Sequence, residues 1–398
     1  MSEPNEIIRI AAKGDGVTAA GQHVPGAVPG DRIAADGQLI PGPHHVTPPC
    51  RHFSTCGGCQ LQHADEAALA QFITERVVHA AEGQGIVADM VAPAHLSPPH
   101  ARRRATLHAQ RRGGSVLLGY REARSHQVVD LAECPVLRPE LFALVATLRT
   151  MLAQWSGKFA ADIELALVDQ GVVCGIKGLR AEGLAQTEAL LDFARDNALA
   201  RLTVDDGYGP ETVWEPEPAT IMLGGVAVSF PVGAFLQATE DGEAALVAAA
   251  REWLAGITPI ADLFSGLGTF ALALAGPEKV LAAEAARDAH LACQQAARRS
   301  GKPVFAQHRD LFRNPLLAEE VSKFGAILLD PPRAGAREQV EQIAQSSVAR
   351  VVYVSCNPAS WAKDAKRLVD AGFMLKGVRP VGQFRWSTHV ELASLFTR

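Results

Sequence analysis

The sequence predicts an α/β fold in which the C-terminal domain is built on a mostly parallel sheet. From about residue 225 onward, short apolar runs alternate with longer segments that carry apolar residues at helical spacing. This alternation is typical of βαβ units, whose helices cover a parallel sheet. The expected strands of the sheet are Ile260–Phe264, Val280–Glu284, Val304–Ala306, Ala326–Leu329, Val351–Val354, Met374–Val378 and Val390–Phe396.

Two further domains are expected before this third domain, which spans residues 225–398. Residues 1–47 are rich in glycine and proline and contain short apolar runs such as Ile7–Ile10, which predicts a short β-barrel. Residues 48–224 combine strand-like runs with helical patterns, which predicts an α+β central domain. Its expected elements are strands at Ser115–Gly119 and Val172–Ile176 and helices at Glu66–Ala81 and Glu140–Leu152.

The composition is that of a globular protein. The chain has 398 residues, of which 48% are hydrophobic and 20% are charged. It contains no apolar run long enough for a membrane helix, and its first residues, MSEPNEIIRI, lack the basic and apolar stretches of a signal peptide. We therefore expect a cytoplasmic protein with no membrane partner, and we take a monomer as its expected state.

A group of arginines stands out, although the net charge of the chain is -5. Between residues 102 and 124 the only acid is Glu122, whereas the arginines are Arg102, Arg103, Arg104, Arg111, Arg112, Arg121 and Arg124. A local basic surface of this kind suits contacts with the phosphates of a nucleic acid. A solvated arginine-rich face explains the same pattern.

The turn after the first expected strand of the large sheet indicates a cofactor site. Asp262, Gly266 and Gly268 occur there, just before a helix that begins near Thr269. Ligands of open α/β sheets bind at the carboxyl ends of the strands. Glycines allow the backbone to approach a ligand closely, and the start of a helix offers free amide groups.

Two further acids follow the next two strands. Glu284 ends the second strand, where a carboxylate can accept both hydroxyl hydrogens of a ribose, and Asp310 follows the third strand. Acids at successive strand ends without a GxGxxG motif favour S-adenosylmethionine as the cofactor over a dinucleotide. A nicotinamide-dependent dehydrogenase is the weaker interpretation.

A cysteine and a glutamate near the last strands are the candidate catalytic residues. Cys356 stands at the end of the fifth strand, in Ser355-Cys-Asn-Pro358, beside polar residues. Carbon 5 of uracil accepts a methyl group only after a thiolate has added to carbon 6, a role that suits Cys356. The proton on carbon 5 must then leave, and Glu391 is the candidate general base.

The motif Asp330-Pro-Pro-Arg-Ala-Gly335 follows the fourth strand. Asp330 is expected to hold the uracil edge or to position the cofactor, and Arg333 to bind a phosphate or the enolate oxygen. In enzymes that methylate amino groups, an aromatic residue typically takes the place of Arg333. This motif therefore argues against methylation of an exocyclic nitrogen.

The cysteines of the N-terminal half predict a metal cluster. The chain has seven cysteines and no secretory signal, so disulfides are not expected. Cys50, Cys56 and Cys59 follow the pattern C-x5-C-x2-C, and Cys134 lies 75 residues after the last of them. Four thiolates suit an iron-sulfur cluster or a structural zinc. Zinc more often uses two CxxC pairs, so a 4Fe-4S cluster is favoured.

As a set, these residues resemble the RNA uracil-5-methyltransferase family, and most closely its iron-sulfur branch acting on 23S ribosomal RNA. The resemblance covers nearly the whole chain and rests on CRHFSTCGGCQLQH, GYREARSHQVVDLAECPVL, FLQAT, DLFSGLGTF, LDPPRAG, YVSCNPAS and HVE. It implies a short N-terminal barrel of the TRAM-like, oligonucleotide-binding (OB) type, and a central iron-sulfur domain that contacts RNA. It also implies a C-terminal Rossmann-like class I methyltransferase domain.

The resemblance also implies roles for individual residues. Cys356 falls on the family's nucleophile and Glu391 on its base. The enzymes of this family flip the target base out of its stack, which suits a loop uridine in folded RNA. The residues expected to line the cofactor site are Gln237, Phe264, Thr269, Glu284, Asp310 and Asp330.

Several positions depart from the family pattern. Ser265 often is a cysteine in the family, Thr239 replaces an asparagine, Ala296-Ala stands where Asn-Ala is usual, and the segment Gln383-Phe-Arg-Trp-Ser387 is unusual. The short barrel and this last segment leave the RNA target open. An enzyme of the same fold that acts on a uridine of transfer RNA, or on carbon 5 of cytosine, is the first alternative, although the iron-sulfur cysteines argue against the typical transfer RNA enzyme. A non-catalytic RNA-binding factor is the alternative from another class. Because methyl transfer by a thiolate needs no electron, we expect the cluster to be structural.

Overall fold

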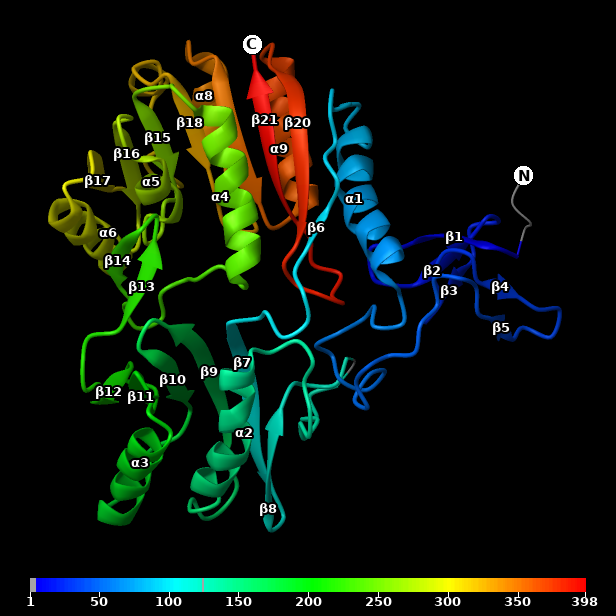
Figure 1. The fold of residues 1–398 in the computed structure, drawn as a ribbon, viewed down its shortest axis with the longest axis vertical. Coiled ribbons are helices and arrows are strands. Elements are labelled where there is room, and N and C mark those ends of the chain that lie inside the picture. The colour runs from blue at the N-terminus through cyan, green and yellow to red at the C-terminus, as the bar shows by residue number, and fades with distance from the viewer. Residues whose placement is uncertain (1–4, 124) are drawn as a thin grey trace. The chain divides into compact units, whose positions relative to one another are not determined.

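The computed structural model describes residues 5–123 and 125–398, which divide into two compact units (Figure 1). The first unit contains Met1–Leu69, Ser97–Thr220 and Phe384–Thr388. The second contains Ala70–Leu96, Ile221–Gln383 and His389–Arg398. Helix α1 (Glu66–Glu82) begins in the first unit and ends in the second, and it confirms the helix expected at Glu66–Ala81.

The second unit contains an eight-stranded sheet in the order β17-β16-β15-β18-β19-β21-β20-β6. Its first five strands are parallel, whereas β21 runs antiparallel to both of its neighbours. All seven expected strands are present, and the two-residue strand β6 at the edge was not predicted. The bounds are β6 His95–Leu96, β15 Ile260–Leu263, β16 Val280–Glu284, β17 Val304–His308, β18 Ala326–Leu329, β19 Arg350–Ser355, β20 Met374–Gly382 and β21 Glu391–Thr397.

Helices cover this sheet. The helix α4 packs against β19, β20 and β21, and α9 also packs against β20 and β21. Every residue of the central strands β15 and β18 is buried, as is typical of parallel strands in a sheet that helices cover. The helix bounds are α4 Glu240–Leu254, α5 Thr269–Leu274, α6 Arg287–Ser300, α7 Ala318–Val321, α8 Arg337–Gln345 and α9 Pro358–Asp370. No helix within the described residues is long and apolar enough to cross a membrane.

The first unit contains a six-stranded sheet in the order β12-β11-β10-β9-β7-β8, with the helices α2 (Pro139–Leu152) and α3 (Leu184–Asp196). Buried and less buried residues alternate along β9 and β10, because one face of the sheet packs against the core that α2 also lines. The predicted strands and the predicted second helix are confirmed. The strands are β7 Arg104–Arg112, β8 Ser115–Gly119, β9 Ala160–Val168, β10 Gly171–Lys177, β11 Arg201–Asp205 and β12 Glu211–Trp214.

The N-terminal segment forms small sheets. One has three strands, β1 (Ile7–Ile10), β2 (Gly16–Thr18) and β3 (His23–Val24), and another pairs β4 (Arg32–Ile33) with β5 (Leu39–Ile40). The strand expected at Ile7–Ile10 is confirmed, while the closed barrel stays a prediction. A further two-stranded sheet, β13 (Thr220–Leu223) with β14 (Val226–Ser229), comes before α4 in the sequence.

Candidate active site

The carboxyl edge of the parallel strands gathers the candidate cofactor residues. In the pairing of β15 with β16 and β18, the last paired residue of each strand directly precedes Phe264, Glu284 or Asp330. These three residues therefore lie at one edge of the sheet, as the sequence predicts for a ligand site.

The glycine turn between β15 and α5 lies against the glutamate that ends β16. Glu284 Oε2 accepts a hydrogen bond of 2.8 Å from the Gly266 N–H. A Cβ atom at Gly266 would meet no atom within 4 Å, so this side of the turn is open. Gly268 has φ +91°, and a Cβ there would lie 2.6 Å from the Sγ of Cys293. Thr269 begins α5, as predicted.

Asp262 has a structural role. The sequence predicts it as one of the acids at the strand ends that face the cofactor, but its side chain is fully buried within β15. Its Oδ2 accepts a hydrogen bond of 2.8 Å from the Ala271 N–H, so this amide of α5 is not available to a ligand. Burial raises the pKa of Asp262 to about 7, with a smaller contribution from Glu284.

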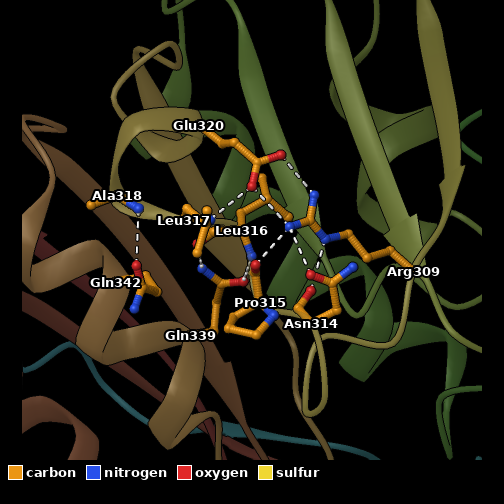
Figure 2. A network of polar contacts seen from close by, with 9 residues as sticks. All are labelled: Arg309, Asn314, Pro315, Leu316, Leu317, Ala318, Glu320, Gln339 and Gln342. Carbon is orange, nitrogen blue, oxygen red and sulfur yellow. Dashed lines mark hydrogen bonds and ion pairs between the residues drawn. The ribbon is translucent and has the colours of Figure 1, made fainter.

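Asp310 begins a loop that an arginine network anchors (Figure 2). Its neighbour Arg309 donates two hydrogen bonds of 2.8 Å to Glu320 and one of 2.6 Å to the carbonyl of Pro315. The Asp310 Oδ1 accepts a hydrogen bond of 3.0 Å from the Phe312 N–H. The Phe312 ring lies 5.3 Å from that of Phe264, between centroids. The loop therefore brings Asp310 and Phe264 to the same part of the edge.

The candidate nucleophile and base lie across two antiparallel strands. Ser355 of β19 pairs with Leu392 of β21, and continuing this register sets Cys356 opposite Glu391. Burial raises the pKa of the Cys356 thiol, and the charges of Glu391 and Asp330 raise it further, whereas Arg333 lowers it. The structure thus brings the four predicted reactive side chains together.

Backbone and side-chain contacts connect the loops that carry these residues. The carbonyl of Arg333 accepts hydrogen bonds from Asn357 Nδ2 at 2.9 Å and from Ser360 Oγ at 3.0 Å. The Arg333 guanidinium lies 3.2 Å from His389 Nδ1. Since Asn357 also caps the first turn of α9, the Cys356 loop is fixed on both sides.

Two buried glutamines join the carboxylates at this edge. Gln237 Nε2 lies 3.5 Å from Asp330 Oδ2, and Gln237 Oε1 accepts a hydrogen bond of 2.8 Å from Gln383 Nε2. Gln383 Nε2 also donates to Glu391 Oε2. The resemblance described above predicted Gln237 as a site residue, but it did not predict Gln383. The only signal for Gln383 was its place in the unusual segment that precedes Glu391.

The four cysteines predicted to hold a cluster line one pocket of the first unit. Cys50, Cys56, Cys59 and Cys134 share it with apolar and aromatic residues and with the charged residues Arg102 and Glu133. Burial raises the pKa of all four thiols, that of Cys59 to about 12, so their thiolate forms need compensation by positive charge. Within the described part of the chain, no group of three or more His, Cys, Asp or Glu side chains meets the geometry of a site for a metal ion.

The predicted basic surface is smaller than the sequence indicates. Arg103 is buried, with 3% of its surface exposed, and Arg111 donates hydrogen bonds to the carbonyls of Ala153 and Trp155. Arg112 and Arg121 are exposed. Arg124 lies outside the described residues. Part of the arginine cluster therefore stabilises the fold of the first unit.

Comparisons with known proteins agree with this site. The model of the tRNA (uracil-5-)-methyltransferase family matches residues 302–398, which include Cys356 and Glu391. An RNA methyltransferase of Zymomonas mobilis is 51% identical over 394 residues, 99% of each chain. The chain belongs to the RNA uracil-5-methyltransferase family. It is an RNA (uracil-5-)-methyltransferase that uses S-adenosylmethionine.

Two further matches concern relatives with named targets. The 23S rRNA (uracil(1939)-C(5))-methyltransferase of Pectobacterium atrosepticum is 34% identical over 373 residues, 89% of this chain and 80% of that protein. The structure of the tRNA (uracil-54, C5)-methyltransferase of Pyrococcus abyssi, solved with S-adenosyl-L-homocysteine, superposes with a TM-score of 0.75. It covers 98% of this chain and 99% of that chain at 20% identity, which establishes a shared α/β methyltransferase fold.

Proposed function

We propose that this RNA uracil-5-methyltransferase modifies carbon 5 of a specific uridine in 23S ribosomal RNA. The observation that carries the proposal is the register of β19 and β21, in which Cys356 and Glu391 are opposite each other at the sheet edge. The name of the Pectobacterium atrosepticum relative supports the choice of RNA. We further propose that the protein acts as a monomer in the cytoplasm.

The chemistry assigns one step to each catalytic residue. The Cys356 thiolate adds to carbon 6 of the uracil, and the electron pair of the C5–C6 bond moves toward the enolate. Bound S-adenosylmethionine would supply the methyl group: the bond from the methyl carbon to the sulfonium sulfur would break as its bond to carbon 5 forms, which leaves S-adenosylhomocysteine. Glu391 removes the proton from carbon 5, the C5–C6 double bond forms again, and the bond from carbon 6 to sulfur breaks to release the thiolate. Arg333 and Asp330 are proposed to hold the uracil oxygen and edge.

The predicted cofactor residues are suited to an adenosyl group. We propose that Glu284 accepts hydrogen bonds from the ribose hydroxyls, since its carboxylate already binds the amide of the glycine turn. Phe264 and the loop of Asp310 would contact the adenine, and Gln237 and Asp330 the amino acid end. Thr269 would complete the site at the start of α5.

We propose that Cys50, Cys56, Cys59 and Cys134 hold a 4Fe-4S cluster with a structural role. In such a cluster each thiolate binds a different iron, so the four sulfurs need to surround a common pocket rather than a single ion. The cysteines line such a pocket, and the Gly58 N–H lies 3.4 Å from the Cys56 sulfur. In this proposal residues 1–47 form the barrel, 48–224 the cluster and RNA-binding domain, and 225–398 the methyltransferase domain.

The experiment that tests the reaction uses RNA containing 5-fluorouridine. Fluorine at carbon 5 does not leave as a proton does, so the covalent adduct should persist after denaturation in the presence of S-adenosylmethionine. We expect an adduct with 23S RNA for the natural chain and none for Cys356→Ala. If a folded enzyme that binds S-adenosylhomocysteine formed no adduct with any RNA, the covalent mechanism would be wrong.

Transfer RNA is the alternative substrate, because the matching family model carries that name. Offering both RNAs in one reaction distinguishes the two. An adduct confined to transfer RNA would overturn the assignment to 23S RNA, while leaving the mechanism intact. If no RNA were methylated at all, a non-catalytic RNA-binding role would become the better interpretation.

A further inference from the structure

Gln383 joins the base to the rest of the site through a fully satisfied amide. Its side chain is buried, with 1% of the residue exposed, and its Nε2 donates to both Gln237 Oε1 and Glu391 Oε2. Its Oε1 accepts a hydrogen bond of 3.3 Å from the Thr239 N–H. Both amide hydrogens and the amide oxygen therefore have partners.

The backbone of Thr239 determines which way this amide points. A main-chain N–H only donates, so the Gln383 oxygen must face Thr239 and the Gln383 nitrogen must face the two acceptor oxygens. Rotating the amide by 180° would set an oxygen against the Glu391 carboxylate. The orientation of Gln237 follows, since its oxygen receives the Gln383 hydrogen and its nitrogen faces Asp330.

Glycine 242 provides the space that Gln383 occupies. A Cβ atom at Gly242 would lie 2.7 Å from the Gln383 Cβ and 3.2 Å from its Oε1. Gly242 is in the first turn of α4. Its N–H donates a hydrogen bond of 3.1 Å to the Oγ1 of Thr239, the residue that caps this helix. Glycine in a helix is unfavourable relative to alanine, so packing against Gln383 offers a physical reason for it here.

We infer that Gln383 is a positioning residue for proton removal, holding the Glu391 carboxylate ionised and aimed at carbon 5. This inference rests on the proposed function. Glu391 is 4% exposed and shares its surroundings with Asp330 and Cys356, so its negative charge needs a donor. Gln383 supplies that hydrogen bond. It donates to Glu391 directly and reaches the cofactor side of the site only through Gln237. With S-adenosylmethionine at saturating concentration, its loss should therefore slow the second half of the reaction more than the first.

The test compares Gln383→Met with Gln339→Met in single-turnover reactions on RNA with ordinary uridine. Methionine keeps the length of the side chain but neither donates nor accepts as an amide does. Gln339 is the control matched in burial and chemistry, because it is also 1% exposed and its amide binds the N–H and carbonyl of Leu316, in the loop that follows Asp310, rather than Glu391 (Figure 2). S-adenosylhomocysteine binding by each variant reports an intact second unit.

For Gln383→Met we expect the methyl group to transfer within a few-fold of the natural rate. Release of product should slow by roughly tenfold or more, because a general base typically contributes this much or more to proton removal. A denaturation-resistant adduct should then accumulate, and the acid limb of the pH profile for release should move to higher pH. Gln339→Met should show neither effect. Equal slowing of both half-reactions, or release with the natural pH profile, would overturn the inference.

Gly242→Ala provides a second variant that leaves the amide in the chain. Alanine suits a helix, so we expect α4 to fold, while the new methyl group displaces Gln383 together with the Thr239 hydroxyl, whose oxygen would also lie 2.7 Å from the added Cβ. Accumulation of adduct in this variant supports the inference, and natural release kinetics contradict it. If the natural enzyme formed no adduct with 5-fluorouridine RNA, the proposed function would fail and this inference with it. If the natural enzyme forms the adduct but Gln383→Met releases its product at the natural rate, the proposed function stands and only the inference about Gln383 is wrong.

Discussion

At the scale of single residues, the charges around Cys356 govern its reactivity. Burial and two nearby carboxylates raise the pKa of the thiol, so at neutral pH the thiol form predominates and the attacking thiolate is scarce. Arg333 acts in the opposite direction. The rate of adduct formation should therefore rise with pH until the thiol is fully ionised.

Replacing Arg333 by glutamine should make the nucleophile less available. Without the guanidinium the pKa of Cys356 rises further, and we expect adduct formation at pH 7.5 to slow by roughly two- to tenfold, since the arginine is exposed and partly screened by solvent. The measurement is the rate of trapping by 5-fluorouridine RNA between pH 6 and pH 10, whose profile should move to higher pH. Arg337→Gln, an exposed arginine paired with Glu341, is the control. An unmoved profile for Arg333→Gln would contradict this role.

At the scale of elements, the turn from β15 to α5 depends on one glycine for two reasons. Gly268 has a left-handed backbone, and its missing Cβ leaves room for Cys293 of α6. The turn therefore determines how closely α6 approaches the strand end. Gly266, in the same turn, is open on its side-chain face.

Gly268→Ala should destabilise the protein more than an alanine at another left-handed glycine. Gly301, at the end of α6, has φ +68° and open space around it, so Gly301→Ala should cost only about 1 kcal/mol of backbone strain. For Gly268→Ala we expect about 1–3 kcal/mol in addition, from overpacking against the Cys293 sulfur. Urea unfolding of both variants measures the difference. Adding Cys293→Ala should recover part of the extra loss; if it recovers none, the contact is not the cause.

At the scale of the whole molecule, the cysteine pocket belongs to the first unit and the eight-stranded sheet to the second. Each of these compact units has its own sheet. Loss of the proposed cluster should consequently affect the first unit and leave cofactor binding by the second in place.

Two cysteines of the first unit make a matched pair for this test. Burial raises the pKa of both Cys59 and Cys174 to about 12, but only Cys59 lines the pocket with the other three cysteines. We expect Cys59→Ala to lose bound iron and sulfide, while Cys174→Ala keeps both. Isothermal titration should find S-adenosylhomocysteine affinity unchanged in each. Natural iron content in Cys59→Ala would rule out the proposed cluster.

The sequence by itself determined the strands of the large sheet and the residues at their ends. Apolar runs and flanking polar residues are local features, so the position of Glu284 at a strand end follows from periodicity alone. The resemblance added Gln237 and assigned the family's nucleophile and base to Cys356 and Glu391, because short motifs keep their spacing in the chain. The edge strand β6 was missed, since two residues carry too little periodicity to be recognised.

Only the tertiary structure decided which polar side chains are buried and what they contact. From the sequence, Asp262 was expected at a ligand site and Arg103 at the surface, yet both side chains are buried in the fold. Gln383 gains its role from the backbone of Thr239, which is 144 residues away in the chain, and from Glu391 on the next strand. Burial and hydrogen bonding between distant segments depend on packing of the whole unit, and no local pattern in the sequence encodes them.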